Sequence, residues 1–151
     1  MNKKLAIILV NWNQYELTKS CIMSIFNCSY KKFKIILVDN CSKDKSVTKL
    51  KKDFPNVHFI LNNSNLGFTG ANNKGIEYAK SEGYEYIMLL NNDTEVDENF
   101  IEPLLYRLNY EKDIGAVQPL ILNFHNQKTV WNFGGRFNKF FGIPVTLNKN
   151  I

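Results

Sequence analysis

The stretch Leu5-Ala6-Ile7-Ile8-Leu9-Val10-Asn11 decides the fold of this 151-residue chain. A short run of apolar residues that ends abruptly at a polar one is typical of a strand buried on both faces of a sheet. The pattern returns at Phe33–Val38 and at Tyr86–Leu90, and Val57–Leu61 is a shorter version of it. The sequence therefore predicts four buried strands.

Helical patterns separate these strands. Leu17, Cys21, Ser24, Ile25 and Cys28 recur at the spacing of a helix that lies on a sheet, which makes both cysteines small core residues. Further helices are predicted near Lys43–Phe54, at Thr69–Glu82 and from Asp97 onward. Because strand and helix alternate four times, we expect an α/β fold with a mostly parallel sheet and helices on both faces.

The last part of the chain is less regular. Ile114–Leu122 is predicted to be a further strand. Beyond Asn123 the residues are aromatic and glycine-containing with weak periodicity, which is consistent with a meander or a loop region. We expect a first domain over 1–123 and the start of a second region over 124–151.

The composition indicates a folded protein of the cytoplasm. Hydrophobic residues make up 44% of the chain, enough for a packed core. The apolar run after Lys4 is too short for a secretory signal, and no stretch is long enough for a membrane span. Cys21, Cys28 and Cys41 lack metal or redox spacing.

The net charge of +5 comes mostly from lysine. We interpret the lysines of the segment from Lys43 to Lys52 as a solvated helix face, with peripheral association at the inner face of an anionic membrane as the alternative. Nucleic acid is not expected as a partner, because neither arginines nor aromatic residues accompany the lysines.

Polar residues gather where the predicted strands end. The carboxyl ends of parallel strands share one edge of the sheet, and ligands bind there. We therefore expect a binding crevice formed by Asn11, Asn13, Asp39, Asn40, Asn91, Asn92 and Asp93, with Asn63, Asn65 and Gly67 from the loop after the third strand.

Several ligand classes are excluded by missing motifs. No dinucleotide fingerprint follows the first strand, and Ile76 stands where a phosphate-binding loop needs lysine. His58 and His125 lack partners for zinc or nucleophilic catalysis. Two carboxylates remain: Asp39 can accept hydrogen bonds from a base or ribose, and Asp93 can hold a divalent cation that bridges phosphates. This pairing describes a nucleotide-diphosphate site.

Four motifs, in order, resemble those of the family 2 glycosyltransferases, inverting enzymes with the GT-A (Rossmann-like) fold. They are Ile8-Leu9-Val10-Asn11-Trp12-Asn13, Ile36-Leu37-Val38-Asp39-Asn40-Cys41-Ser42-Lys43-Asp44, Asn65-Leu66-Gly67-Phe68-Thr69-Gly70-Ala71-Asn72-Asn73-Lys74-Gly75 and Leu89-Leu90-Asn91-Asn92-Asp93-Thr94. The resemblance covers roughly residues 4–123. The residues of the last two motifs are most similar to those of the rhamnosyltransferase-like branch.

The resemblance implies roles for individual residues. Asn11 and Trp12 would flank the base and ribose, and Asp39 would accept the N3 hydrogen of uracil or thymine. Asn65 and Gly67 would shape the floor of the nucleotide pocket.

The segment Asn91-Asn92-Asp93 stands at the family's Asp-x-Asp motif. Asp93 would ligate Mg²⁺ or Mn²⁺ on the diphosphate, with Asn92 near the ribose and Asn91 beside the nucleotide. The chain departs from the family at two positions: Asn91 replaces the first aspartate, and Asn72 stands where many relatives have arginine.

The activity implied is transfer of a sugar from a UDP- or dTDP-linked donor to a hydroxyl of a glycan or lipid-linked acceptor, with inversion. The family's general base is a carboxylate after the metal motif, yet no Asp or Glu follows Asp113. We therefore expect the base beyond Ile151 and this chain to be the N-terminal donor-binding portion of a longer enzyme. A non-catalytic nucleotide-binding or scaffold module, and a receiver-like signalling domain phosphorylated at Asp39, remain as alternatives.

Overall fold

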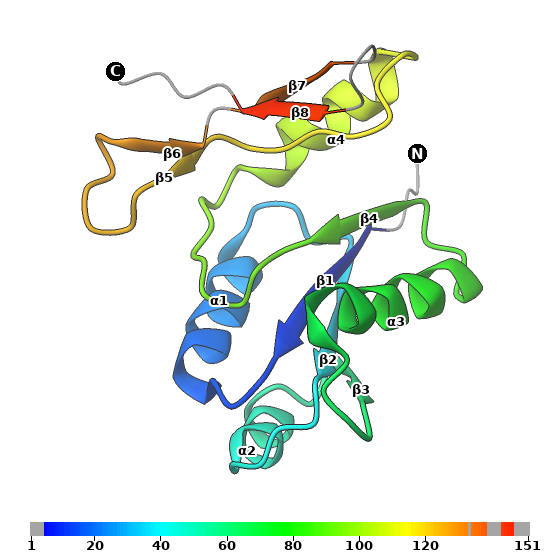
Figure 1. The fold of residues 1–151 in the computed structure, drawn as a ribbon, viewed down its shortest axis with the longest axis vertical. Coiled ribbons are helices and arrows are strands. Elements are labelled where there is room, and N and C mark those ends of the chain that lie inside the picture. The colour runs from blue at the N-terminus through cyan, green and yellow to red at the C-terminus, as the bar shows by residue number, and fades with distance from the viewer. Residues whose placement is uncertain (1–4, 133, 139–142, 147–151) are drawn as a thin grey trace. The chain divides into compact units, whose positions relative to one another are not determined.

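The computed structural model describes residues 5–132, 134–138 and 143–146. The chain divides into two compact units, residues 1–99 and 100–151. The first unit is built on a parallel sheet of four strands in the order β3-β2-β1-β4 (Figure 1). Its elements are β1 (Leu5–Asn11), α1 (Tyr15–Asn27), β2 (Phe33–Asp39), α2 (Ser46–Asp53), β3 (His58–Leu61), α3 (Gly67–Ser81) and β4 (Tyr86–Leu89).

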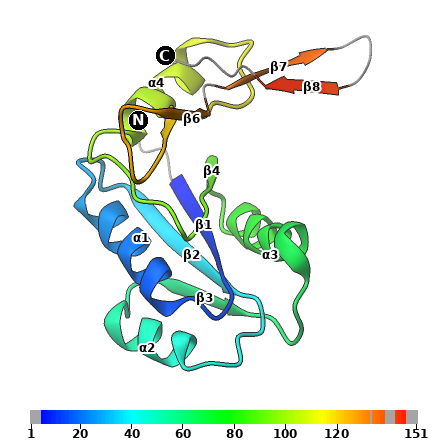
Figure 2. The same ribbon diagram turned by 60° about the vertical axis from the view of Figure 1, so that its left-hand side comes forward.

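Helices cover both faces of this sheet, as predicted. Figures 1 and 2 show α1 and α2 side by side on one face and α3 on the other. The core between α3 and the sheet contains Ala6, Ile8, Ile36, Val38, Ala71 and Ala79. At Gly75, α3 comes so close to β1 that a Cβ atom would lie 2.6 Å from Ile8 Cγ2. Small residues on α3 therefore allow the helix to lie directly on the central strands.

The buried stripe of α1 differs from the predicted one. Cys21 and Ile25 are buried as expected, and so is Cys28 just after the helix, but Leu17 is 47% exposed. Thr18 takes the inward position instead. The apolar pattern missed this change because Thr18 is held inside by a hydrogen bond from its hydroxyl to Asn11 Oδ1, at 2.9 Å.

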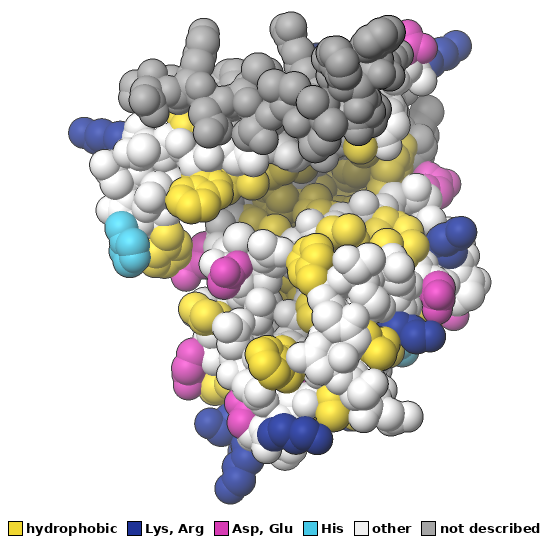
Figure 3. All heavy atoms as spheres, in the orientation of Figure 1, with side chains coloured by type: hydrophobic (Ala, Val, Ile, Leu, Met, Phe, Trp, Pro, Cys, Tyr) yellow, Lys and Arg dark blue, Asp and Glu magenta, His cyan; other side chains and the backbone are white. Residues whose placement is uncertain are grey.

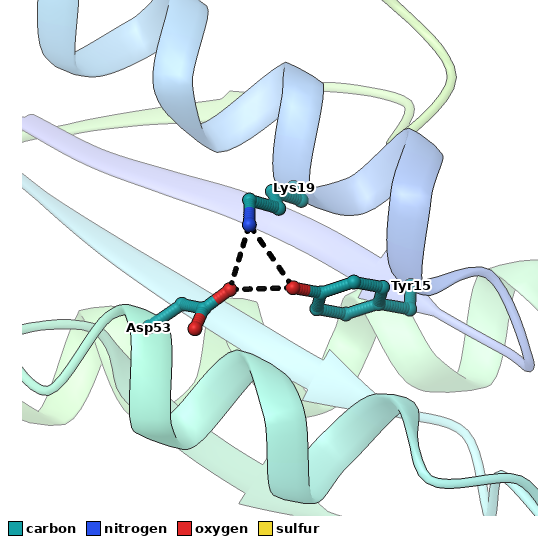
Figure 4. Close-up of polar contacts among 3 residues, drawn as sticks. All are labelled: Tyr15, Lys19 and Asp53. Atoms are coloured by element: carbon teal, nitrogen blue, oxygen red, sulfur yellow. Dashed lines mark hydrogen bonds and ion pairs between the residues drawn. The ribbon is translucent and has the colours of Figure 1, made fainter.

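A polar cluster joins α1 to α2 on the surface (Figure 4). The Tyr15 hydroxyl donates to Asp53 Oδ2 at 2.6 Å, and Lys19 Nζ lies 3.0 Å from the same oxygen and 3.1 Å from the Tyr15 oxygen. The hydrogen bond from Tyr15 contributes most, and the one from Lys19 contributes next, to holding the pKa of Asp53 below its ordinary value. Around α2 the lysine side chains project into solvent, as predicted (Figure 3).

Several element boundaries differ from the sequence-based ones. Helix α2 begins at Ser46 because the backbone N–H groups of Lys43 and Asp44 donate to Asn13 Oδ1, at 2.7 and 3.3 Å, outside any helix. Strand β4 was expected to be buried but is only partly so, and Leu89 is 49% exposed. It has a neighbouring strand on one side only within the described sheet.

The described residues of the second unit form one helix and two antiparallel strand pairs. These are α4 (Ile101–Tyr110), β5 (Ile121–Leu122) paired with β6 (Val130–Asn132), and β7 (Gly135–Asn138) paired with β8 (Ile143–Thr146). The predicted strand at Ile114–Leu122 is therefore wrong except for its last two residues. Pro119, which has no N–H group for a strand ladder, interrupts it.

Helix α4 begins four residues later than the acidic residues that were expected to open it. Asp97 Oδ1 instead accepts a hydrogen bond from the Asn99 N–H, at 2.8 Å, in a turn before the helix. The functional boundary near Asn123 stays a prediction. Among the described helices, none has the length and apolar character needed to cross a membrane.

Candidate functional site

The predicted polar residues do meet at the carboxyl edge of the sheet. The parallel register places Asn11, the last residue of β1, opposite Asp39, the last residue of β2. On the other side of β1, the Leu90 N–H after β4 donates to Ile8 O at 3.1 Å. Three strand ends thus bring their polar residues to one edge.

Asp39 lies inside this edge and is only 4% exposed. Its Oδ1 accepts hydrogen bonds from Asn11 Nδ2 at 2.8 Å and from the Ser42 hydroxyl at 2.5 Å. Its Oδ2 accepts one from the Ser42 backbone N–H at 2.9 Å. Both carboxylate oxygens are therefore engaged within the protein, and they fix the start of the loop after β2.

Asn11 continues the hydrogen bonding toward the other strand ends. It is fully buried, and its Nδ2 also lies 3.0 Å from Ser46 Oγ. Its Oδ1 accepts from the Thr18 hydroxyl at 2.9 Å, and the Thr18 oxygen accepts from Asn92 Nδ2 at 2.8 Å. A continuous path of hydrogen bonds therefore connects Asp39 after β2 with Asn92 after β4.

Asn40 performs the same linking role toward α3. Its Nδ2 donates to Asn65 Oδ1 at 2.7 Å and to Gly67 O at 3.2 Å, and its Oδ1 accepts from the Leu66 N–H at 2.9 Å. The backbone of Gly67 has a φ of +68°, a conformation that favours glycine. The loop after β3 is therefore held against the loop after β2.

A pocket of about 410 Å³ opens at this edge. It is lined by Val10, Trp12, Gln14, Asn40, Asn65, Gly67, Phe68, Leu90, Asn91, Asn92 and Asp93. Seven of the eleven predicted residues line it, whereas the buried Asn11 and Asp39, and also Asn13 and Asn63, do not. The expected contact of Asp39 with a base stays a prediction.

Two of the lining residues expose aromatic rings. Trp12, which was predicted, lies in the loop after β1 and is 53% exposed, and Phe68, which was not predicted, lies at the start of α3 and is 63% exposed. Aromatic rings that expose this much surface at a pocket offer flat apolar faces to a ligand. Val10, Gln14 and Leu90 also line the pocket and were not predicted. These residues lie in or beside the predicted motifs, but their types do not by themselves indicate a binding site.

Helix α1 supports the turn that carries the predicted metal ligand. The Cys21 thiol donates to Asn91 O with the sulfur 3.6 Å away, and the Thr94 hydroxyl donates to the same oxygen at 2.7 Å. Burial raises the pKa of Cys21 to about 11. The thiol therefore stays protonated near neutral pH and acts as a small packing group.

Asp93 is exposed and, among the described residues that line the pocket, is the single ionisable one. The described part of the chain contains no group of three or more His, Cys, Asp or Glu residues that could hold a metal ion. One carboxylate fits a cation of the Mg²⁺ type, which keeps much of its coordination for water and substrate phosphates. Asn72 does not line the pocket; it is 4% exposed and donates to Phe68 O at 2.9 Å.

A parallel α/β sheet with its pocket at the carboxyl ends of the strands defines a ligand-binding α/β protein. Comparison with known proteins identifies its family. The chain belongs to glycosyl transferase family 2, whose model matches residues 6–149.

Curated relatives include glycosyltransferases from archaea and bacteria. The low-salt glycan biosynthesis hexosyltransferase Agl10 of Haloferax volcanii is 30% identical over 120 residues, which cover 79% of this chain and 37% of the relative. The GalNAc(5)-diNAcBac-PP-undecaprenol β-1,3-glucosyltransferase of Campylobacter jejuni is 32% identical over 110 residues, covering 70% and 35%. The chain thus spans little more than a third of the length of these relatives.

Solved structures share the fold. The S. aureus TarS fragment 1–349 in complex with UDP-GlcNAc matches with a TM-score of 0.62 at 15% identity, covering 78% of this chain and 38% of that one. TarS 1–349 in complex with UDP matches with a TM-score of 0.60 at 17% identity, covering 78% and 39%. These matches confirm the expected GT-A-type fold.

Proposed function

We propose that this chain binds the nucleotide-sugar donor of an inverting, metal-assisted glycosyltransferase that uses a UDP- or dTDP-linked sugar. The observation that carries this proposal is the pocket at the carboxyl edge, which has exposed aromatic rings from Trp12 and Phe68 and one free carboxylate at Asp93. Flat apolar faces suit a base, amide groups suit ribose hydroxyls, and a lone carboxylate suits a cation shared with a diphosphate.

The reaction would be direct displacement at the anomeric carbon of the donor sugar by a hydroxyl of a glycan or lipid-linked acceptor. A divalent cation, when bound, neutralises charge on the leaving diphosphate. In this chain Asp93 would hold that cation together with the phosphate oxygens. The amides of Asn91 and Asn92 would orient the nucleotide beside it. The general base remains unassigned.

Calorimetry on the chain with UDP, dTDP and GDP, with and without Mn²⁺, tests the proposal. We expect pyrimidine diphosphates to bind more tightly than GDP, and Mn²⁺ to strengthen the binding. Asp93→Ala should abolish the Mn²⁺ effect. Lys74→Ala is a matched control, because this lysine pairs with Glu77 on the surface of α3 and does not line the pocket. Failure of all three nucleotides to bind would refute the proposal.

The role of Asp39 needs its own comparison. If it accepts the N3 hydrogen of a pyrimidine, Asp39→Ala should weaken UDP binding at least about tenfold more than Lys74→Ala does. The alternative in which Asp39 is a phosphoacceptor is disfavoured, since its carboxylate is buried and both oxygens already accept hydrogen bonds.

The residues of the last two motifs support a donor sugar of the kind that the rhamnosyltransferase-like branch uses. Competition between dTDP-rhamnose and UDP-GlcNAc for the chain tests this directly, and preferential binding of UDP-GlcNAc would refute it. We also propose that the protein acts in the cytoplasm, where the exposed lysines of α2 would attract an anionic membrane surface. Sedimentation with phosphatidylglycerol vesicles, against phosphatidylcholine vesicles, measures that attraction.

A further inference from the structure

In the hydrogen-bond network around Asn11, behind the pocket, each group can act in only one way, as donor or as acceptor. Asp39 and Asp44 are carboxylates, which can only accept hydrogen bonds when ionised. The Ser42 hydroxyl gives its hydrogen to Asp39, and the Ser46 hydroxyl gives its own to Asp44, each at 2.5 Å. Both hydroxyl oxygens can therefore act only as acceptors toward Asn11.

This directionality fixes the amide of Asn11. Its Nδ2 faces three oxygens, those of Asp39, Ser46 and Ser42, at 2.8, 3.0 and 3.1 Å. None of the three has a hydrogen to offer, so an oxygen of Asn11 placed there would be repelled. The Asn11 Oδ1 must point the other way, toward Thr18, and it accepts the Thr18 hydroxyl hydrogen at 2.9 Å.

The orientation of Asn11 in turn fixes that of the Asn92 amide, which lines the pocket. Because the single hydrogen of the Thr18 hydroxyl goes to Asn11, the Thr18 oxygen can only accept, and it accepts from Asn92 Nδ2 at 2.8 Å. Gln14 Oε1 takes a second hydrogen bond from that nitrogen, at 3.0 Å. The Asn92 Oδ1 has no hydrogen-bond partner among the described residues, although Asn92 lines the pocket beside Asp93.

We propose that Thr18 is a positioning residue: it transmits the fixed orientation of Asn11 to Asn92, so that Asn92 offers its amide oxygen, and not its nitrogen, to the ligand. Without Thr18, either orientation of the planar amide would be accessible. The identity of the ligand rests on the proposed function, in which the donor to this oxygen is a hydroxyl group of the nucleotide. The orientation itself does not depend on that function.

A measurement without ligand tests the orientation. In ¹H–¹⁵N spectra, the side-chain amide of Asn92 is identified by its loss in Asn92→Ala. We expect this signal to shift and to exchange faster with solvent in Thr18→Val, which keeps the side-chain shape, and to be restored in Thr18→Ser. Thr48→Val, on the exposed face of α2, is the matched control. An unchanged Asn92 signal in Thr18→Val would overturn the proposal.

Nucleotide affinity tests the consequence. Thr18→Val should weaken UDP binding about tenfold, and Thr18→Ser should stay within about twofold of the original chain. In an Asn92→Ala background, Thr18→Val should cause no further loss, because Thr18 acts through Asn92. An equal loss in both backgrounds would overturn the proposal.

Two further outcomes remain decisive. If the original chain binds no nucleotide, the proposed function fails, while the amide signal still decides the role of Thr18. If Thr18→Val does not fold, Thr18→Ala replaces it, because it also removes the hydroxyl that accepts from Asn92 and places no methyl group against the Asn11 amide oxygen. The Asn92 signal must then shift in Thr18→Ala, and the loss of affinity must vanish in the Asn92→Ala background; otherwise the proposal is wrong.

Discussion

The ends of β2 and β4 carry the same kinds of residue but use them in opposite ways. Asp39, at the end of β2, is 4% exposed and accepts hydrogen bonds from three donor groups. Asp93, in the segment after β4, is exposed and has no hydrogen-bond partner among the described residues. One aspartate is part of the scaffold, and the other is free to meet a ligand.

The position of each strand in the sheet explains the difference. Strand β2 lies between β1 and β3, so neighbouring strands and loops surround its end and supply donors. Within the described sheet, β4 has only β1 beside it. A buried carboxylate must be satisfied by internal hydrogen bonds, whereas an exposed one is satisfied by water until a ligand arrives.

The largest expected effect is on folding, at Asp39. Asp39→Ala leaves Asn11 and Ser42 without their shared acceptor, which should lower the free energy of unfolding by about 3 kcal/mol. Urea denaturation followed by circular dichroism measures this change. A loss below about 0.5 kcal/mol, the size of an ordinary surface substitution, would show that Asp39 is not part of the scaffold.

The second prediction concerns the close packing of α3 against β1 at Gly75. A Cβ at position 75 would lie 2.6 Å from Ile8 Cγ2, so Gly75→Ala forces α3 away from β1. Overpacking typically costs about 1–3 kcal/mol, which exceeds the gain of up to about 1 kcal/mol in helix propensity. We expect a net loss of about 1 kcal/mol in the same denaturation experiment. Stabilisation by Gly75→Ala would contradict it.

The third prediction concerns Asp93, the exposed aspartate after β4. Asp93→Asn removes a charge but no hydrogen bond within the described residues, so the free energy of unfolding should change by less than about 0.5 kcal/mol. The affinity for UDP in the presence of Mn²⁺ should fall about tenfold, equivalent to about 1.4 kcal/mol. Equal UDP affinities of the Asp93→Asn variant and the original chain in Mn²⁺ would show that Asp93 does not help to bind the cation.

The sequence predicted the order of elements well because apolar runs and helical spacing depend on burial alone. It placed Leu17 inside the protein and gave no role to Thr18, since a periodicity of apolar residues cannot detect a threonine that is held inside by Asn11. It failed at Ile114–Leu122 for a related reason: apolar residues suggested a strand, although Pro119 cannot join a hydrogen-bonded ladder.

The candidate site was predictable in part. Strand ends can be located from sequence, and parallel strands bring those ends together, so Asn11, Asp39 and Asp93 were expected at one edge. Which of them faces the pocket depends on hydrogen bonds between residues far apart in the chain, such as the one from Thr18 to Asn11. A single sequence contains no signal for those partners, and the burial of Asp39 was therefore not foreseen.

The smallest expected effect is a pH dependence within the network behind the pocket. The hydrogen bond from the Ser46 hydroxyl, more than any other contact, holds the pKa of Asp44 below its ordinary value of 3.8. Because the folded-state pKa is the lower one, Asp44 contributes stability above pH 3.8 and loses that contribution as the pH falls through the folded-state pKa.

Asp44→Asn should therefore flatten the decline in unfolding free energy as the pH falls below about 4. The effect should be modest, because the carboxyl group is exposed to solvent and its interactions are screened. Denaturation curves of the two chains at matched pH values measure the difference between the slopes. Parallel curves would mean that Asp44 does not stabilise the folded state by accepting the Ser46 hydrogen, and the fixed direction of the network would then rest on Asp39 alone.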